Sequence, residues 1–446
     1  MSLMVLTVVG WPGAVSAQGG DFRVDMPHPR LLLNAHRLKL LKKERERQSL
    51  RWNQFELLMA GKAPMPEPGF ADALYYQVGS NVEAGNRAIT WALGQGTDLR
   101  QLALVFDWCR DLLNDGQAKA LTAKIVRGMQ ASAKETSCAA ARSRILASVA
   151  ISGEASEIAE REMNQIVHNW WEGQIGPSLN AGREALTLDD TYALFEMLHV
   201  LRDNLNLDLR ETSPRFFRDL AMVHLLSYYP ASFPAGENEY RIPATVHATS
   251  EPDLNRAALA RAADFAMVAY DTNAPGSQIL QGWLMNDNYL LRGTFGAPYE
   301  FLWANPYQPG LSYYHAPKVL HDELIGRLFV RSNWEESASW LGFFDGELQL
   351  FEDGRVTALN AHLAAEPLSM GSADILFGAN TQKFKVAVEG EEPVFVVGLK
   401  PRRTYVVEVD DEEMTEAVTD PGGVLGLDMP HKAATGVRVS EWQDTR

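Results

Sequence analysis

Residues 164–211 read NQIVHNWWEGQIGPSLNAGREALTLDDTYALFEMLHVLRDNLNLDLRE. Apolar residues recur at helical spacing on both sides of a polar segment, 176–190. The pattern predicts one helix before this segment and one after it, and Asp189 or Asp190 is expected to cap the second helix. Polar loops held between rigid helices often carry function. The segment 176–190 is therefore the first place where we expect chemistry.

The helical pattern extends in both directions from this stretch, from Asn34 to about Thr272. Short loops between helices of similar length imply antiparallel neighbours. We therefore predict that residues 21–272 form an (α/α) toroid of helical hairpins. The expected helices are one that begins at Asn34 and carries Leu38 to Leu58, followed by 68–80, 84–94, 98–113, 117–133, 138–152, 154–171, 190–204, 214–228 and 253–271.

The pattern changes twice after the helical region. Residues 273–322 are rich in Pro, Gly, Asn and Tyr, which predicts an irregular junction with one short helix around 281–291. From 323 to 446 short apolar runs alternate with turn signals, which predicts an antiparallel β-sandwich. The acidic run from Glu408 to Glu416 is expected to be a solvated connection. The expected strands are 324–331, 339–345, 347–352, 355–360, 384–388, 393–398, 404–409, 424–427 and 436–440.

Length and charge narrow the class of protein. A chain of 446 residues is too long for one ordinary core, so more than one domain is expected. Its net charge of −16 argues against nucleic acid and anionic membranes as partners. A short apolar run and a Val15-Ser16-Ala17 sequence predict that residues 1–20 are a signal-peptide remnant, with a disordered tail as the alternative. We therefore expect a periplasmic or secreted protein without membrane insertion.

The sequence indicates neither a metal nor a cofactor. Cys109 and Cys138 share no metal-like spacing and are expected to be buried free thiols. No spacing is typical of a zinc, phosphate-loop, nucleophile-elbow or dinucleotide motif. The sequence leaves the oligomeric state open.

Several stretches, in their order and spacing, resemble the heparinase II/III-like and alginate-lyase-like polysaccharide lyases. His28-Pro29-Arg30-Leu31-Leu32 resembles the segment before the first family helix, and 105–113 resembles a recurrent family helix. Residues 184–199 resemble the segment that carries a catalytic tyrosine. Residues 328–343 resemble the opening strands of the family sandwich. The resemblance implies an acidic polysaccharide or oligosaccharide as the partner.

Lyases of this family remove a proton next to a uronate carboxylate and then expel the glycosidic oxygen. Such a site needs a group that neutralises the carboxylate, a base, and an acid for the leaving oxygen. The family's Asn-His motif should fall near 135–138, where neither residue occurs. Its two sandwich histidines should fall on Leu348 and Leu350, which predicts that the usual imidazole and metal ligand are missing.

The catalytic candidates are Tyr192, Arg183 and Glu184. Tyr192 matches the family tyrosine, and the alternative is a tyrosine that packs with its hydroxyl in water. Arg183 could bind a carboxylate bidentately. Glu184 could pair with Asp189 or Asp190 as in a hydrolase, although these two aspartates also suit helix capping.

The substrate-binding candidates come from the same region and from aromatic clusters. Arg142 and Arg144 lie where the missing neutralising motif should be, and helix-surface charge is the alternative. Trp170, Trp171 and Tyr289 could stack on sugar rings or pack between elements. The substrate-binding set is completed by an amide of the polar segment, Asn180. His199 is expected to be a packed core residue.

Three functions remain open. The first is a polysaccharide lyase that cleaves a uronic-acid glycan by β-elimination. The second is a catalytically impaired protein that binds glycans on the lyase scaffold. The third is a glycoside hydrolase that uses loop carboxylates.

Overall fold

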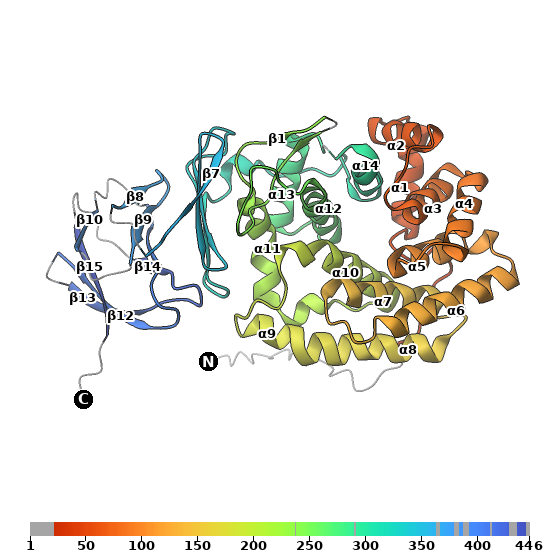
Figure 1. The fold of residues 1–446 in the computed structure, drawn as a ribbon, viewed down its shortest axis with the longest axis horizontal. Coiled ribbons are helices and arrows are strands. Elements are labelled where there is room, and N and C mark those ends of the chain that lie inside the picture. Colours follow the sequence, from red (N-terminus) through yellow and green to blue (C-terminus); the bar gives the residue numbers. More distant parts are fainter. Residues whose placement is uncertain are drawn as a thin grey trace, which may run out of the picture.

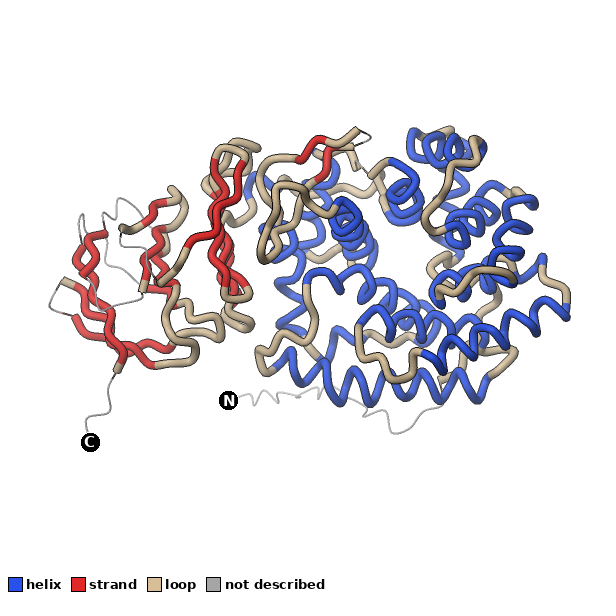
Figure 2. Tube along the Cα trace, in the orientation of Figure 1, coloured by secondary structure: helices blue, strands red, loops and turns tan. Residues whose placement is uncertain are grey.

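The structure is a computed structural model that describes residues 22–236, 238–289, 291–362, 366–378, 383–386, 392–410, 413–427 and 435–442. The tail expected over residues 1–20 lies outside these ranges. Helices make up the N-terminal part of the chain and sheets make up the C-terminal part (Figures 1 and 2). A multidomain α and β architecture was expected, and its division into helical and sheet regions is confirmed at this level.

Some helices pack on the next helix in the sequence, such as α3 with α4 and α7 with α8, and others pack on helices further along the chain, such as α5 with α7 and α7 with α10. The α-helices are α1 Ala35–Glu46, α2 Leu50–Ala60, α3 Pro68–Gly79, α4 Val82–Leu93, α5 Leu99–Trp108, α6 Asp115–Ala131, α7 Cys138–Ile151, α8 Ser156–Asn164, α9 Gly176–Asn180, α10 Thr191–Leu205, α11 Pro214–Ser227, α12 Leu254–Tyr270, α13 Pro275–Asn286 and α14 Gly293–Trp303.

Side-chain caps explain where several helices begin. Asn34, Asn81, Asp98 and Ser137 each accept a hydrogen bond from a backbone N–H in the first turn of the following helix. Every residue of α5 is buried, so this helix lies at the centre of the helical region. Cys109 and Cys138 are buried free cysteines, as expected.

Two helical expectations are wrong. The single helix expected from Asn34 to Leu58 is two helices, because the chain turns at Gln48, where φ is +52°, and Ser49 caps α2. The segment 273–322 contains two full helices, α13 and α14, where only one short helix was expected. Pro275 stands in the first turn of α13, where a missing N–H costs nothing. The turn-forming residues of α14, which include Pro298, hid its helical pattern.

The polar segment is more structured than expected. The helix before it continues from α8 as an eleven-residue π-helical stretch, Gln165–Ile175, and then as α9. A 3-10 turn, Leu188–Asp190, leads directly into α10. Asp190 accepts hydrogen bonds from the backbone N–H and hydroxyl of Thr187, at 3.0 and 2.9 Å. Asp190 therefore occupies the N-cap position of α10 but its side chain closes the 3-10 turn.

The strands form three larger sheets and one small hairpin. The sheet orders are β3-β4-β5-β6-β7, β14-β11-β9-β8, β10-β15-β12-β13 and β1-β2. The strands are β1 Phe233–Pro234, β2 Glu239–Tyr240, β3 Val319–Asp322, β4 Arg327–Arg331, β5 Trp340–Phe344, β6 Glu347–Glu352, β7 Arg355–Leu359, β8 Leu368–Ser369, β9 Asp374–Phe377, β10 Lys383–Val386, β11 Val394–Val397, β12 Thr404–Val409, β13 Glu413–Val418, β14 Leu425–Leu427 and β15 Thr435–Glu441.

The antiparallel expectation holds with one exception. Strands β9 and β11 pair in parallel, with Val394 opposite Asp374. The acidic run was also misread. Residues 413–418 form β13, which pairs with β12 along its whole length, so this run contains a strand as well as a turn.

The five-stranded sheet lies between the helices and strands β8–β15 (Figure 1). Side chains alternate between the two faces of a strand. On this sheet Phe329, Trp340 and Phe344 join the core of the helical region. Their neighbours Leu328 and Leu341 pack with β9 and β11 on the other face. Both faces of the sheet are therefore buried, and one of them is held against the helices by aromatic packing.

Within the described residues, no helix is both long and apolar enough to cross a membrane.

Candidate functional site

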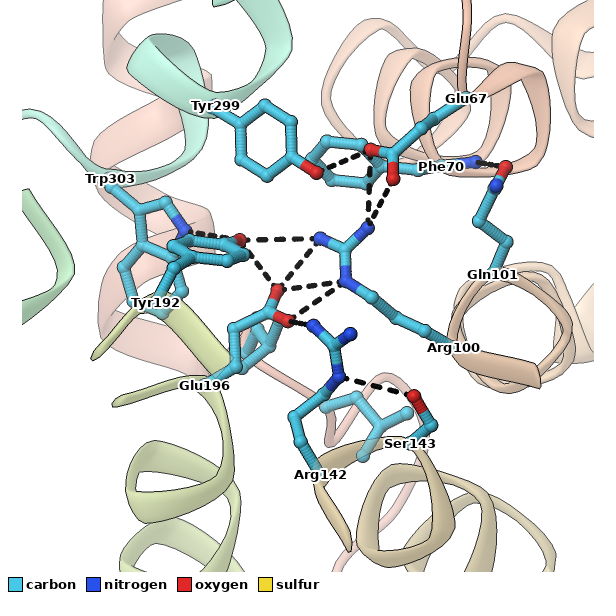
Figure 3. Close-up of polar contacts among 12 residues, drawn as sticks. Glu67, Phe70, Arg100, Gln101, Arg142, Ser143, Tyr192, Glu196, Tyr299 and Trp303 are labelled. Carbon is cyan, nitrogen blue, oxygen red and sulfur yellow. Dashed lines mark hydrogen bonds and ion pairs between the residues drawn. The ribbon is translucent and has the colours of Figure 1, made fainter. Parts of the chain in front are cut away.

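Tyr192 lies inside the helical region, in a cluster of buried polar side chains (Figure 3). Its hydroxyl donates a hydrogen bond to Glu196 at 2.6 Å. It accepts hydrogen bonds from Arg100 at 3.2 Å and from the Trp303 indole at 3.1 Å. The phenol is 4% exposed. The hydrogen-bonding capacity of its oxygen is therefore used within the protein.

Two glutamates and two arginines balance the charge of this cluster. Glu196 accepts hydrogen bonds from Arg100, at 2.7 and 2.8 Å, and from Arg142. Arg100 also reaches Glu67, at 3.3 Å. The hydroxyl of Tyr299 donates to Glu67 at 2.5 Å. Helices α3, α5, α7 and α10 bring the four charged groups together near their N-terminal ends, and Tyr299 comes from the C-terminal half of α14.

Burial alone would raise the pKa of Glu196, but Arg100 and Arg142 outweigh it, and the pKa is lowered. Burial raises the pKa of Tyr192 well above its usual value, and the neighbouring Glu196 raises it further. Tyr192 therefore keeps its proton at neutral pH. A tyrosine base needs the opposite shift, so this environment does not suit Tyr192 to the role of base.

The other arginines predicted for the site lie in different surroundings. Arg142 is a member of the cluster, with a side chain that is 12% exposed. Arg144 is buried and forms an ion pair with Glu162 of α8. Arg183 is exposed on the surface of the polar segment. The structure therefore brings Arg142 to Tyr192 but does not bring Arg144 or Arg183 there.

The predicted aromatic contacts with sugar are wrong for at least one residue, because Trp171 is fully buried and donates to Thr212 at 2.7 Å. Trp170 is 7% exposed and donates to the backbone of Thr136. Tyr289 is 6% exposed and accepts a hydrogen bond from Gln281. These rings pack within the protein and do not present open faces.

Asn180 donates to the carbonyl of Thr212 at 2.8 Å, which ties α9 to the loop before α11. His199 is fully buried, and its ring contacts the carbonyl of Ala266 at 3.0 Å, as a packed core histidine. Burial, more than the neighbouring arginines, lowers the pKa of His199 well below its usual value, so the ring is neutral.

A separate cleft of about 200 Å³ opens between the helical region and the five-stranded sheet. We call it the seam cleft. On the helical side it is lined by Glu184, Asp189 and Arg256, and on the sheet side by Arg327 and Asp345. Tyr192 is not among its lining residues, although Asp189 precedes it by less than one helical turn.

The charged groups of the seam cleft form ion pairs, and the pair between Glu184 and Arg327 crosses it. Arg327 of β4 forms an ion pair with Glu184 and approaches Asp345 at 3.6 Å. Arg256 of α12 pairs with Asp189 at 2.7 Å and donates to two backbone carbonyls. Both guanidinium groups therefore line a cavity that solvent can enter, and each of them is paired with a carboxylate.

An exposed imidazole follows a lining residue of the seam cleft in the chain. His247 follows Val246, which lines the cleft, and its side chain is 92% exposed. Nδ1 of His247 lies 3.1 Å from Glu347. Glu347 accepts a hydrogen bond from Gln349 at 2.6 Å, and Gln349 accepts one from Tyr229 at 2.7 Å. The chain from Tyr229 to Glu347 thus fixes the carboxylate that orients the ring.

His247 also has an unusual backbone, with φ of +56°. Left-handed φ is uncommon for a residue other than glycine, and such positions gather at functional sites. Its backbone N–H donates to Glu347 at 3.0 Å, so the same carboxylate holds both the backbone and the ring.

The position of β6 shows where the two leucines lie that stand at the expected histidine positions. Leu348 and Leu350 pack on the face turned away from the helices. The residue between them, Gln349, reaches toward the helices, where its amide donates to the carbonyl of Thr245. A histidine at either leucine would therefore face the interior between sheets, and the seam-facing positions are Glu347 and Gln349.

Sequence reasoning missed Arg256, Arg327 and Asp345 and could not place His247. One signal was present, because Glu347 and Gln349 are polar residues at alternate positions of an otherwise apolar strand. Among the residues that the structure describes, no three His, Cys, Asp or Glu side chains converge to hold a metal ion. No protein-family model matches this chain, and no curated protein matches it either.

Proposed function

We propose that the protein is a polysaccharide lyase of the heparinase II/III-like kind that its sequence resembles. In this proposal it cleaves a uronic-acid glycan by β-elimination in the seam cleft. The observation that carries the proposal is the His247–Glu347 pair, in which His247 directly follows Val246, a lining residue of the cleft that contains Arg256 and Arg327. The proposal also includes the architecture of this kind of lyase, in which an (α/α) toroid is followed by a β-sandwich.

The reaction explains why these groups suit the site. A base takes the proton from the carbon next to the uronate carboxylate, and the bond from the neighbouring carbon to the glycosidic oxygen breaks. A double bond forms between the two carbons, and the leaving oxygen gains a proton. The first proton becomes acidic enough only when a cation binds the carboxylate. Guanidinium groups do this well because they match a carboxylate with two parallel hydrogen bonds.

Each role has a candidate in the cleft. Glu347 engages Nδ1 of His247, which leaves Nε2 to accept the proton, and imidazole is the commonest base in such steps. A substrate carboxylate would take the place of Glu184 on Arg327 or of Asp189 on Arg256. The imidazolium that forms at His247 then returns its proton to the leaving oxygen, so the proton taken from the carbon is the proton that the oxygen gains. Polymers of this class lie outside the cell membrane, so the proposal includes export to the periplasm or the medium.

Hydrolysis is the second candidate, and one observation favours it. Glu184, Asp189 and Asp345 line the same cleft, so three carboxylates face two arginines there. Paired carboxylates are the usual machinery of glycoside hydrolases. A hydrolase would release reducing ends without an unsaturated sugar, and a protein that only binds glycans would release neither.

The test is a panel of uronate polymers assayed for near-ultraviolet absorbance and for reducing ends. The lyase proposal predicts both signals together. It also predicts that His247→Gln lowers the rate roughly 100- to 10,000-fold, the usual contribution of a general base. His168→Gln is the matched control, because His168 pairs with Glu172 at 2.7 Å on the outer helical surface. Reducing ends without absorbance would replace the lyase by a hydrolase.

A further inference from the structure

A second cavity, of about 240 Å³, lies inside the helical region. We call it the arginine cavity. Its walls come from most of the length of α1, from the start of α2, from the C-terminal ends of α10, α12 and α14, from α13 and from the loop 304–308. The seam cleft adjoins the opposite, N-terminal ends of α10 and α12, where Asp189 pairs with Arg256. The two cavities are therefore separate.

The arginine cavity carries a positive charge in an acidic protein. Arg37, Arg51 and Arg202 line it with Glu44, which gives three positive charges, one negative charge and a net charge of +2. The whole chain has a net charge of −16. A positively charged cavity in such an acidic protein indicates an anionic ligand. The attraction between the arginines and an anion is stronger inside a protein than in water.

Two of the three arginines have structural duties that account for them. Arg51 pairs with Glu44 at 2.9 Å and donates to carbonyls at the end of α14. Arg202 pairs with Asp203 and donates to the carbonyl of Tyr270 at the end of α12. Such contacts satisfy helix carbonyls that have no partner within the helix.

Arg37 differs from these two arginines in its lack of a carboxylate partner among the described residues. Its guanidinium donates to the carbonyl of Leu32 and stacks on Trp303 at 4.2 Å. Within the described part of the chain it forms no ion pair within 4.0 Å. Burial is the main reason that the pKa of Arg37 is lowered to about 10; Asp203 opposes this shift and Arg202 adds to it. The group stays charged at neutral pH, so its charge is held in a cavity beside another cation.

We propose that the arginine cavity binds a small monocarboxylate that carries hydroxyl groups, of the sugar-acid class. The guanidinium of Arg37 has no carboxylate partner and matches one carboxylate of a ligand. A dianion such as phosphate would also need Arg51 and Arg202, which already pair with carboxylates. The lining also contains apolar side chains, including Leu40, Leu41 and Val268, which suit the C–H face of a sugar ring. The volume falls just below the range of roughly 300–1,000 Å³ for drug-sized ligands, so a single ring is the expected size.

His36 and Tyr307 complete the site at its open side. Both line the cavity and are exposed. An imidazole and a phenol can donate to hydroxyl groups or accept from them. The proposal stands apart from the proposed function, because recognition of a free sugar acid requires no cleavage and uses none of the seam-cleft residues.

Calorimetric titration of the full chain with glucuronate, glucose and inorganic phosphate tests this inference. We expect saturable binding of glucuronate that weakens as salt rises, and no saturable binding of glucose. Arg37→Gln should weaken glucuronate binding at least tenfold. Arg37→Lys keeps the buried charge but loses the two parallel hydrogen bonds, so it should weaken binding several-fold. Arg218→Gln, an exposed arginine of α11 paired with Asp219, is the control and should bind normally.

Three results would overturn the inference. They are the absence of glucuronate binding, phosphate binding tighter than glucuronate, and glucuronate binding that is unchanged in Arg37→Lys. Because a free monosaccharide is not a polymer substrate, the inference can fail while lyase activity is present, and it can hold while lyase activity is absent.

Discussion

The cluster around Tyr192 and the seam cleft contain the same kinds of side chain in opposite circumstances. In the cluster, Glu196 is fully buried and lies between Arg100 and Arg142. In the cleft, Arg327 pairs with Glu184 beside a cavity open to solvent. Buried charges are tolerated in a fold where every one of them is paired. In an ion pair beside a cavity, by contrast, a ligand can replace one of the two partners.

This difference separates stabilising groups from groups available for chemistry. The resemblance to the lyase family favoured Tyr192, because it matches the catalytic tyrosine of that family. Its surroundings instead raise its pKa, since burial and Glu196 act in the same direction. His247 has the reverse circumstances, with an exposed ring and a single carboxylate partner. The comparison therefore predicts structural effects for changes in the cluster and functional effects for changes in the cleft.

The largest expected effect on stability is that of Glu196→Gln. This change leaves Arg100 and Arg142 as buried cations without their shared carboxylate. Removing one partner of a buried ion pair costs about 3–5 kcal/mol. Denaturant unfolding should show a loss of this size, with Glu172→Gln on the exposed surface as the control. A loss below about 1 kcal/mol would contradict the assignment of the cluster to stability.

A buried carboxyl group without the two guanidinium partners should behave differently. Glu300 is 5% exposed, and burial raises its pKa to about 8, although Arg51 lowers it in part. Because the folded state holds this proton up to a higher pH than the unfolded state, stability is greatest below pH 4.5 and falls as pH rises toward 8.

The slope from this one group is about 1.4 kcal/mol per pH unit, or about 3 kcal/mol between pH 5 and 7. Glu300→Gln should remove this component of the pH dependence. Unfolding free energies measured between pH 5 and 7 test this prediction. The control variant Glu172→Gln should show the same slope as the original protein. An identical slope in Glu300→Gln and the original protein would show that Glu300 is ionised when folded.

The smallest of these effects belongs to Tyr192→Phe. The change leaves the Trp303 indole without its acceptor and removes one donor from Glu196. An unsatisfied buried group costs about 1–3 kcal/mol of unfolding free energy. The midpoint temperature of thermal unfolding should therefore fall. In the polymer assay the variant should retain activity wherever it is folded. Loss of turnover without loss of stability would return Tyr192 to the catalytic site.

Much of the helical region could be predicted from local pattern. Apolar spacing and polar caps such as Asp98 and Ser137 mark helix positions directly in the sequence. The turn at Gln48 and the helix α14 were missed because their positions depend on packing against other elements. Strand β13 was missed because cross-strand pairing with β12, and not its own composition, makes it a strand.

The site was harder to predict because its pairs are distant in the sequence. Asp189 and Arg256 are 67 residues apart, and Tyr192 and Arg100 are 92 residues apart. Glu184 was identified from the polar segment, but its partner Arg327 belongs to the sheet. Periodicity cannot report such contacts, since they exist only once helices and strands have packed.

The most direct test of the central claim is a crystal structure of His247→Gln with a bound uronate oligosaccharide. The account predicts a sugar in the seam cleft, with its carboxylate on Arg256 or Arg327 and its neighbouring carbon facing residue 247. An oligosaccharide bound only elsewhere, with the Glu184–Arg327 and Asp189–Arg256 pairs intact, would contradict it.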